Sequence, residues 1–320
     1  MGSGVSPGLS PPGQPPAREG VGASCVVTPA GNWGTLLDFL DARMPAVGRS
    51  LWQARMAGGL VLDADGLAVS PASLFRPGQR LYYYRSVPVE PTIPGLETVV
   101  FQDERLVVAD KPHGLPVTPS GPYLQQTLLV RLRRRLGLET LTPIHRIDRE
   151  TAGLVLFVVR PADRDAYHAL FRQHAVTKSY EALAAVPGRL DLPLVRRSRL
   201  QTDPSAFFRM CEVEGTPNSQ TRISLQVQRD GVACYHLQPK TGQRHQLRVH
   251  MNALGLPIAG DQLYPRALLG PGEADDGRTP LQLIARRLAF TDPVTGRPRC
   301  FESTRTLDWS VARACLQPTS

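Results

Sequence analysis

The stretch IHRIDRETAG, residues 144–153, runs directly into the apolar segment LVLFVV, residues 154–159. A short continuous apolar segment of this kind predicts a buried strand. The polar stretch before it then forms a loop that ends on a rigid element, where a carboxylate can be held in a fixed position. Asp148 is therefore a candidate nucleophile or general base. A turn or capping aspartate paired to a neighbouring arginine is the alternative interpretation.

Strands and helices are expected on both sides of this stretch. Before it, the pattern predicts a hairpin over residues 98–109 and a helix over residues 126–136. After it, we expect strands at residues 180–186, 223–227 and 233–237, and helices at residues 164–174 and 242–254. This is an α+β pattern, with a mixed or antiparallel sheet flanked by helices.

The N-terminal part of the chain predicts a smaller unit. Helical spacing of apolar residues begins at Thr35 and a second helix covers residues 49–57, before short strands at residues 60–62 and 81–84. Residues rich in glycine, proline and serine precede this unit, and prolines follow it. We expect four segments: a disordered tail (1–24), a small α/β domain (25–87), a linker (88–96) and a larger domain (97–320).

Composition favours a polyanionic partner. The 320 residues carry 37 Lys and Arg against 28 Asp and Glu, a net charge of +9. Surplus arginine suits phosphate groups, although general surface charge is the alternative. The five cysteines form no C-x-x-C pair, which argues against a disulfide framework or a zinc site. Because no apolar stretch suits a membrane span or a signal peptide, we expect a cytoplasmic protein that does not bind membranes.

Two further segments are rich in polar residues. TKSYEAL, residues 177–183, opens a strand, and its Tyr180 could stack on a base or exchange a proton, with core packing as the alternative. In PKTGQRHQLRVHM, residues 239–251, Thr241 is expected to cap a helix. Arg244 and Arg248 would then lie one turn apart on a single cationic face.

The cationic face of this helix suits a phosphate or a carboxylate, and a solvated basic face is the alternative. His245 and His250 are five residues apart, which does not place two metal ligands on one side of a helix. We therefore expect no metal site.

Taken together, these segments resemble the motif blocks of the RluA-type pseudouridine synthases. The family's catalytic block, HRLD followed by two variable residues and TSGL, is similar to residues 145–154, with Ile147 and Ala152 as the differences. Its T-G-R-x-H-Q-x-R-x-H-M block is similar to residues 241–251, with Gln243 in place of an arginine. Five blocks follow the family's order: residues 107–117, 145–154, 178–183, 241–251 and 257–264.

The resemblance implies that uridine in ribosomal or transfer RNA is isomerised to pseudouridine without a cofactor. The N1–C1′ bond breaks, the uracil turns, and C5 bonds to C1′. By resemblance, Asp148 is the catalytic carboxylate, Tyr180 packs on the uracil and helps proton transfer, and Arg248 pairs with Asp148. Contacts with RNA are expected from Arg146, Lys178, Lys240, Arg244, His245 and Arg49.

The small N-terminal domain resembles an S4-type RNA-binding domain, and we expect the protein to be a monomer. The sequence leaves two alternative functions: an RNA-binding or ribosome-assembly module without catalysis, and a metal-dependent nuclease. The joint presence of Asp148, Tyr180 and Arg248 argues against the first. A nuclease requires clustered carboxylates, and only Asp148 and Glu150 lie close together in the sequence.

Lysine is rare in this chain, since 34 of the 37 Lys and Arg residues are arginine. The three lysines, Lys111, Lys178 and Lys240, each fall in or beside one of the motif blocks. Our hypothesis is that these positions require a compact ammonium group that a planar guanidinium cannot replace.

Overall fold

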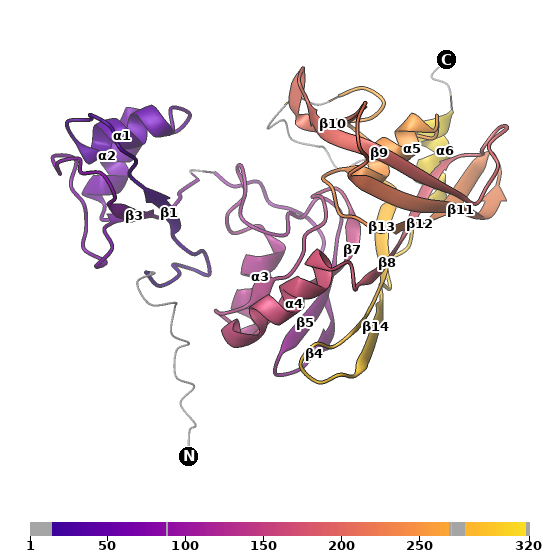
Figure 1. Cartoon of the computed structure of the whole chain (residues 1–320), viewed down its shortest axis with the longest axis horizontal. Coiled ribbons are helices and arrows are strands. Elements are labelled where there is room, and N and C mark those ends of the chain that lie inside the picture. Colours follow the sequence, from indigo (N-terminus) through magenta and orange to yellow (C-terminus); the bar gives the residue numbers. More distant parts are fainter. Residues whose placement is uncertain (1–14, 88, 269, 271–278, 318–320) are drawn as a thin grey trace. The chain divides into compact units, whose positions relative to one another are not determined.

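The computed structural model describes residues 15–87, 89–268, 270 and 279–317. The chain divides into two compact units (Figure 1). Unit 1 comprises residues 1–91, 122–126 and 130–140, and unit 2 comprises residues 92–121, 127–129 and 141–320. The boundary after Pro91 lies in the stretch predicted as a linker. Residues 122–126 and 130–140 were expected in the larger domain but group with unit 1 instead.

Unit 1 has a three-stranded antiparallel sheet and two helices. Its elements are β1 (Ser24–Val27), α1 (Leu36–Arg43), α2 (Arg49–Ala57), β2 (Val61–Leu62) and β3 (Arg80–Tyr83), and the strand order is β1-β3-β2. Helix α1 begins where predicted because Thr35 Oγ1 accepts a hydrogen bond from Asp38 N, while Asp38 Oδ2 accepts one from Thr35 N. Leu40 and Trp52 are fully buried between the helices and the sheet.

The predicted disordered tail is too long. Its first fourteen residues lie outside the described residues, but residues 15–24 form part of unit 1. Arg18 and Val21 exchange backbone hydrogen bonds, and Tyr84 Oη donates to Pro16 O at 2.6 Å. These bonds and the buried side chains of Val21 and Ala23 hold the segment in unit 1.

Unit 2 is built on one large sheet, which confirms the predicted α+β fold. Its eleven strands are β4 (Thr98–Gln102), β5 (Leu106–Lys111), β6 (Thr142–Pro143), β7 (Ala152–Val158), β8 (Thr177–Ala185), β9 (Leu194–Asp203), β10 (Ala206–Val213), β11 (Ser219–Arg229), β12 (Val232–Pro239), β13 (Leu283–Thr291) and β14 (Pro298–Glu302). The main path runs β10-β9-β11-β12-β8-β13-β7-β5-β4, while β14 pairs with β13 and β6 with β7. Among the strand pairs of the described residues, only β13–β7 is parallel.

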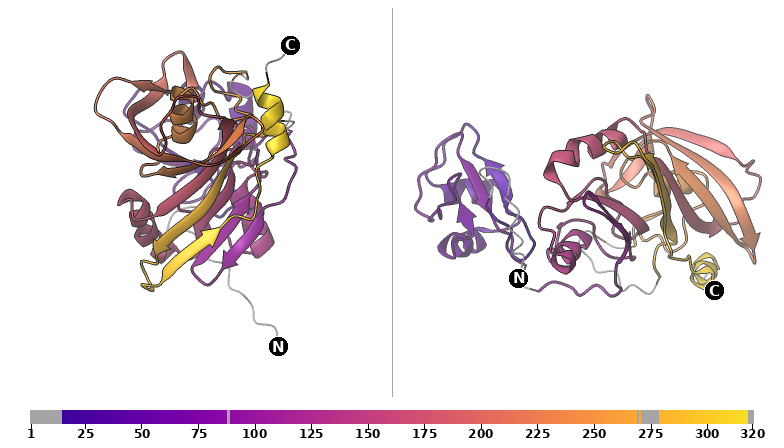
Figure 2. Two further views of the ribbon diagram at one scale, coloured as in Figure 1. Left: turned by 90° about the vertical axis from the view of Figure 1, so that its right-hand side faces the viewer. Right: turned by 90° about the horizontal axis from the view of Figure 1, so that it is seen from below.

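Helices cover both faces of this sheet. After α2, the helices among the described residues are α3 (Leu128–Leu136), which has residues in both units, then η1 (Pro161–Asp163), α4 (Arg164–Arg172), α5 (Gln246–Ala253) and α6 (Trp309–Leu316). Met251 of α5 lies in one buried cluster with Tyr235, whereas Ala312 of α6 lies in another with the neighbouring Cys234. Since successive strand residues point to opposite faces, α5 and α6 lie on opposite sides. Figure 2 shows α6 against the sheet beside the C-terminus. In the described part of the chain, no helix is long and apolar enough to cross a membrane.

The start of α5 differs from the prediction. The helix begins at Gln246, after His245 in the left-handed conformation at φ 52°. Thr241 does not cap it. The Thr241 hydroxyl donates to Gln246 Oε1 at 2.6 Å and accepts from Gln220 N at 3.0 Å, so it ties the loop to β11. Arg244 therefore lies before the helix, and the predicted cationic face shared with Arg248 is wrong.

A glycine joins the predicted loop to the sheet. Gly153 lies at φ 110° in β7, opposite Ala285 of β13. A Cβ at this position would lie 2.4 Å from Ala285 O, so only glycine fits without a backbone shift. This close approach fixes where the loop that carries Asp148 leaves the sheet.

Candidate active site

A cavity of about 440 Å³ lies where the loop before β7, strand β8 and the segment leading into α5 meet. Its volume is in the range of small-molecule and nucleotide sites. Six of the nine predicted site residues line it: Arg146, Asp148, Lys178, Tyr180, His245 and Arg248. The structure thus brings together residues that are up to 102 positions apart in the sequence, from 146 to 248. Arg49, Lys240 and Arg244 do not line this cavity.

Asp148 is the accessible carboxylate of the cavity. Its side chain is 27% exposed, and its Oδ2 lies 3.7 Å from Arg248 Nη1. The backbone is held by a turn in which Thr151 N donates to Asp148 O at 3.2 Å. The carboxylate is therefore positioned beside a cation but remains open to a ligand.

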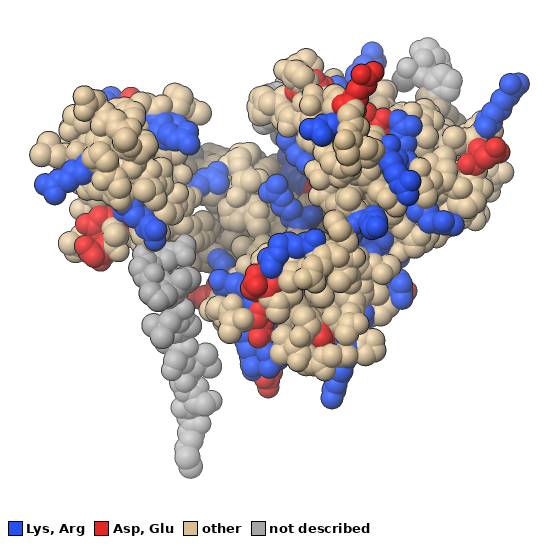
Figure 3. All heavy atoms as spheres, viewed as in Figure 1, with Lys and Arg blue, Asp and Glu red and all other residues tan. Residues whose placement is uncertain are grey.

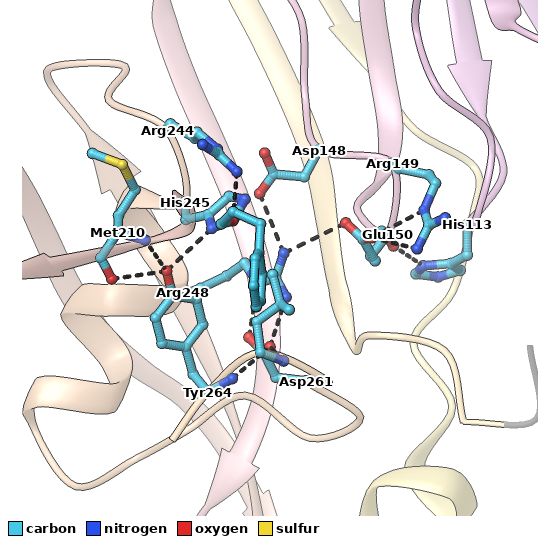
Figure 4. Close-up of polar contacts among 12 residues, drawn as sticks. His113, Asp148, Arg149, Glu150, Met210, Arg244, His245, Arg248, Asp261 and Tyr264 are labelled. Atoms are coloured by element: carbon cyan, nitrogen blue, oxygen red, sulfur yellow. Dashed lines mark hydrogen bonds and ion pairs between the residues drawn. The ribbon is translucent and has the colours of Figure 1, made fainter. Parts of the chain in front are cut away.

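Arg248 is buried, with only 1% of its side chain exposed, and its main partner is Asp261 (Figure 4). Nε and Nη2 donate to the two Asp261 oxygens at 2.8 and 2.6 Å, a bidentate pair. Burial acts to lower the pKa of Arg248, but the hydrogen bonds and charge of Asp261, together with the charges of Asp148 and Glu150, raise that pKa above its ordinary value. The expected pairing of Arg248 with Asp148 is present only as the longer 3.7 Å contact.

Glu150 is a second carboxylate beside Arg248. Its Oε2 lies 3.4 Å from Arg248 Nη1, and its Oε1 lies 3.0 Å from Arg149 Nη2. Burial alone would raise the pKa of Glu150, but the charges of Arg248 and Arg149 lower it below the usual value. Asp148 and Glu150 therefore face one guanidinium, in the geometry of an ion-pair network.

Tyr180 reaches the cavity from β8, as expected. Tyr180 pairs across the sheet with Leu237 of β12 and with Ala285 of β13. Burial, and to a lesser extent the charge of Asp148, raises the pKa of Tyr180 above its ordinary value, so the phenol keeps its proton. The cavity thus contains a protonated hydroxyl together with the Asp148 carboxylate.

His145 and Lys178 help to hold the walls of the cavity. Leu156 N donates to His145 Nε2 at 3.1 Å, and the ring stacks on Phe171 at 4.8 Å. Burial lowers the pKa of His145 to about 3, so the ring is neutral. Lys178 Nζ donates to Thr241 O at 2.9 Å, and burial lowers its pKa to about 8.

The other predicted RNA-contacting residues differ in their surroundings. Arg146 is exposed at the cavity and has no hydrogen-bond or ion-pair partner within the described ranges. Arg244 is exposed and donates to the carbonyl groups of Phe207 and Phe208. Lys240 is exposed outside the cavity, and Arg49 in unit 1 pairs with Asp38 at 2.8 Å.

Three residues of the site received no role from the sequence: Glu150, Asp261 and Tyr264. For a fourth, Lys111, the sequence suggested only that a compact ammonium group is required. Lys111 is fully buried, and its Nζ donates to Pro112 O at 3.0 Å and Arg149 O at 2.9 Å. Burial lowers the pKa of Lys111 to about 7. Asp261 and Tyr264 belong to the motif block at residues 257–264, and this block is the sequence feature that could have identified them. Their partners, however, become visible only in the folded chain.

The chain is similar to known RNA pseudouridine synthases. A family model described as RNA pseudouridylate synthase matches residues 105–253. The chain is 32% identical over 242 residues to an uncharacterized RNA pseudouridine synthase of Synechocystis, covering 74% of this chain and 80% of that protein. It is 31% identical over 234 residues to the dual-specificity RNA pseudouridine synthase RluA of Haemophilus influenzae, covering 68% and 94%. Human RNA pseudouridylate synthase domain containing 1 shares the fold, with a TM-score of 0.54 and 22% identity over 72% of this chain and all of that one.

Proposed function

The chain belongs to the RluA-type RNA pseudouridylate synthases, which isomerise uridine in RNA to pseudouridine, and we propose that its Asp148 is the carboxylate that carries this reaction. One observation carries the proposal. Asp148 is the accessible carboxylate of a cavity in which Arg248, itself fixed by Asp261, lies 3.7 Å away.

The reaction needs little more than this carboxylate and a way to move protons. The N1–C1′ bond breaks and a C5–C1′ bond forms, so N1 gains a proton and C5 loses one. Asp148 can attack C1′ or uracil C6, or remove a proton on a glycal route, and each route begins with a positioned carboxylate. Tyr180 keeps its proton beside Asp148 and can pack on the uracil and take part in the proton transfer.

A uridine within a folded RNA must be turned out of its stack to enter such a cavity. Arg146, exposed at the cavity, would occupy the space that the base leaves or hold the backbone. Lys178 and His245 would contact the nucleotide from inside, while Arg244 and Lys240 would contact phosphates outside. On the face shown in Figure 3, Lys and Arg side chains outnumber Asp and Glu, which supports a polyanionic partner.

Unit 1 is proposed to be an S4-like RNA-binding domain. Support comes from its two helices packed on a small antiparallel sheet and from Arg49 at the start of α2. That the enzyme is a monomer and works in the cytoplasm stays a prediction.

The two alternatives lack comparable support. A module that only binds RNA has no use for an accessible carboxylate beside a buried, oriented arginine. In a nuclease, Asp148 and Glu150 would share a metal ion, but here they share the Nη1 of Arg248.

Release of tritium from RNA labelled with [5-³H]uridine tests the proposed function, because C5 loses its hydrogen when it bonds to C1′. Purified protein is incubated with ribosomal and transfer RNA from cells that lack the gene. We expect release without strand cleavage, and mapping of pseudouridines with and without the gene then identifies the target. Strand scission would favour the nuclease, and retention of RNA without release would favour the binding module.

A further inference from the structure

His245 lies at the entrance to α5 with its ring against the cavity. The residue is 9% exposed and adopts φ 52°. Its Nδ1 lies 3.1 Å from Tyr264 Oη (Figure 4). At this distance the two atoms share one proton, so the other bonds of the hydroxyl decide which atom is the donor.

Tyr264 Oη has two further partners, both on the backbone of Met210. Met210 N donates to the hydroxyl at 2.9 Å, and the hydroxyl donates its single proton to Met210 O at 3.0 Å. The remaining lone pair of Oη can only accept. His245 must therefore carry its proton on Nδ1 and donate it to Tyr264, which leaves Nε2 as a lone-pair acceptor.

The free nitrogen faces the place where chemistry is proposed to occur. His245 lines the same cavity as Asp148, and within the described residues Nε2 has no hydrogen-bond partner. The ring is neutral, because burial lowers the pKa of His245. The charges of Asp148 and Glu150 act to raise this pKa, and those of Arg248 and Arg244 act to lower it. The pKa stays below its usual value.

Most of the charged side chains that line this cavity are donors. Arg146, Lys178 and Arg248 offer only donors, which suit the O2 and O4 atoms of uracil. The side-chain oxygen of Gln246 is already taken by Thr241 and by Gln243 N. Uracil also presents one imide donor, N3–H, which these groups cannot satisfy.

We propose that His245 determines base specificity by accepting a hydrogen bond from uracil N3–H at Nε2. The inference rests on the proposed function. Cytosine has a lone pair at N3, so two acceptors would face each other and a buried acceptor would go unpaired. Tyr264 acts as a positioning residue, because it selects the histidine tautomer whose Nε2 can accept this hydrogen bond.

Two substitutions distinguish base recognition by His245 from a purely structural role of this residue. His245→Asn keeps a donor near the Nδ1 position and tolerates the left-handed backbone, but it removes the atom at Nε2. His245→Gln places an amide near the Nε2 position. Thermal melting shows whether each variant remains folded.

The experiment measures single-turnover pseudouridine formation on an RNA hairpin that contains the mapped target. The hairpin carries uridine, 3-methyluridine or 2′-deoxyuridine at that position. For the wild-type enzyme we expect the N3 methyl group to slow the reaction about 100-fold. We expect His245→Asn to slow the uridine reaction about 10- to 100-fold and to reduce the methyl penalty to about 3-fold, with His245→Gln intermediate.

An equal methyl penalty in wild type and His245→Asn would overturn the proposal, since N3 would not face His245. The proposal would also be overturned if His245→Asn reduced the penalty of the 2′-deoxy substitution and not that of the N3 methyl group. The ribose hydroxyl would then be the donor to His245. A wild-type enzyme that is inactive on the uridine hairpin would contradict the proposed function itself.

Discussion

At the scale of single residues, the site is organised by one guanidinium among three carboxylates. Asp261 takes Nε and Nη2 of Arg248 in short bonds, so Nη1 is the group directed at Glu150 and Asp148. Asp261 is itself held, since Leu263 N and Tyr264 N donate to its Oδ1 at 2.8 and 3.1 Å. Asp261 therefore positions the cation that Asp148 meets.

Removing the charge of Asp261 should be costly for both stability and rate. We expect Asp261→Asn to lower the free energy of unfolding by about 3 kcal/mol, because a buried arginine loses its main partner. Turnover should fall at least about 10-fold while RNA affinity stays within about 3-fold. Urea unfolding and tritium release measure the two effects.

The matched control is Asp230→Asn, which breaks an exposed ion pair with Arg313. It should change stability by less than about 0.5 kcal/mol. Equal effects of the two substitutions would contradict the positioning role of Asp261.

Lys111 predicts a pH-dependent stability. The pKa of Lys111 is about 7 in the folded protein against an ordinary value of 10.5, so between these values the unfolded chain holds a proton that the folded one lacks. The free energy of unfolding contributed by this group therefore rises with pH from about 7 to about 10.5. In Lys111→Met we expect that rise to be smaller by more than about 1 kcal/mol. Urea midpoints at pH 6.5 and 9.5 test it, and parallel curves for the two proteins would contradict it.

The lysine hypothesis gains support at two of its three positions. The buried Lys111 and the half-buried Lys178 each donate to backbone carbonyls of loops at the cavity, as a compact ammonium can. Lys240 is exposed, and its side chain gives no reason to exclude arginine.

At the scale of elements, the junction of β7 and β13 places the catalytic loop. We expect Gly153→Ala to destabilise the protein by more than about 2 kcal/mol, because the new Cβ meets the Ala285 backbone and the backbone at φ 110° is strained. Gly296→Ala is the matched control: Gly296 also has positive φ but has open space around it, so about 1 kcal/mol is expected. Thermal unfolding compares them, and equal losses would show that crowding at β13 is unimportant.

Elements with strong local patterns were predictable. The apolar spacing of α1, the range of α2 and the apolar β7 follow from the sequence. Strands β9 and β10 were not predicted, because β9 carries several arginines and lacks an apolar face. The late start of α5 depends on the bonds of Thr241 to Gln246 and Gln220, which link residues of β11 and α5.

The candidate site was predictable in its members and less so in its pairings. Motif order identified Asp148, Tyr180 and Arg248, and all three line one cavity. The partner of Arg248 was misjudged, since Asp261 reaches it only through the fold of the segment after α5. Sequence spacing alone cannot rank two carboxylates that approach the same arginine from different loops.

At the scale of the whole molecule, the chain combines two units with a net charge of +9. If unit 1 binds RNA through Arg49, Arg49→Gln should weaken RNA affinity about 3- to 10-fold and reduce the salt slope of binding by about one, with turnover of bound RNA unchanged. Titrations at several salt concentrations measure this. Arg313→Gln on α6 serves as the control, and a matching loss in the control would mean that the effect reflects total charge only.

Asp148→Asn tests the central claim most directly. The substitution keeps the shape of the side chain and removes the carboxylate, and tritium release is measured beside RNA affinity. We predict that release falls at least about 10³-fold while the dissociation constant for RNA stays within about 3-fold. Asp230→Asn, at the exposed ion pair with Arg313, should leave both unchanged. Release by Asp148→Asn above about a tenth of the wild-type rate would contradict the assignment of Asp148 as the catalytic carboxylate.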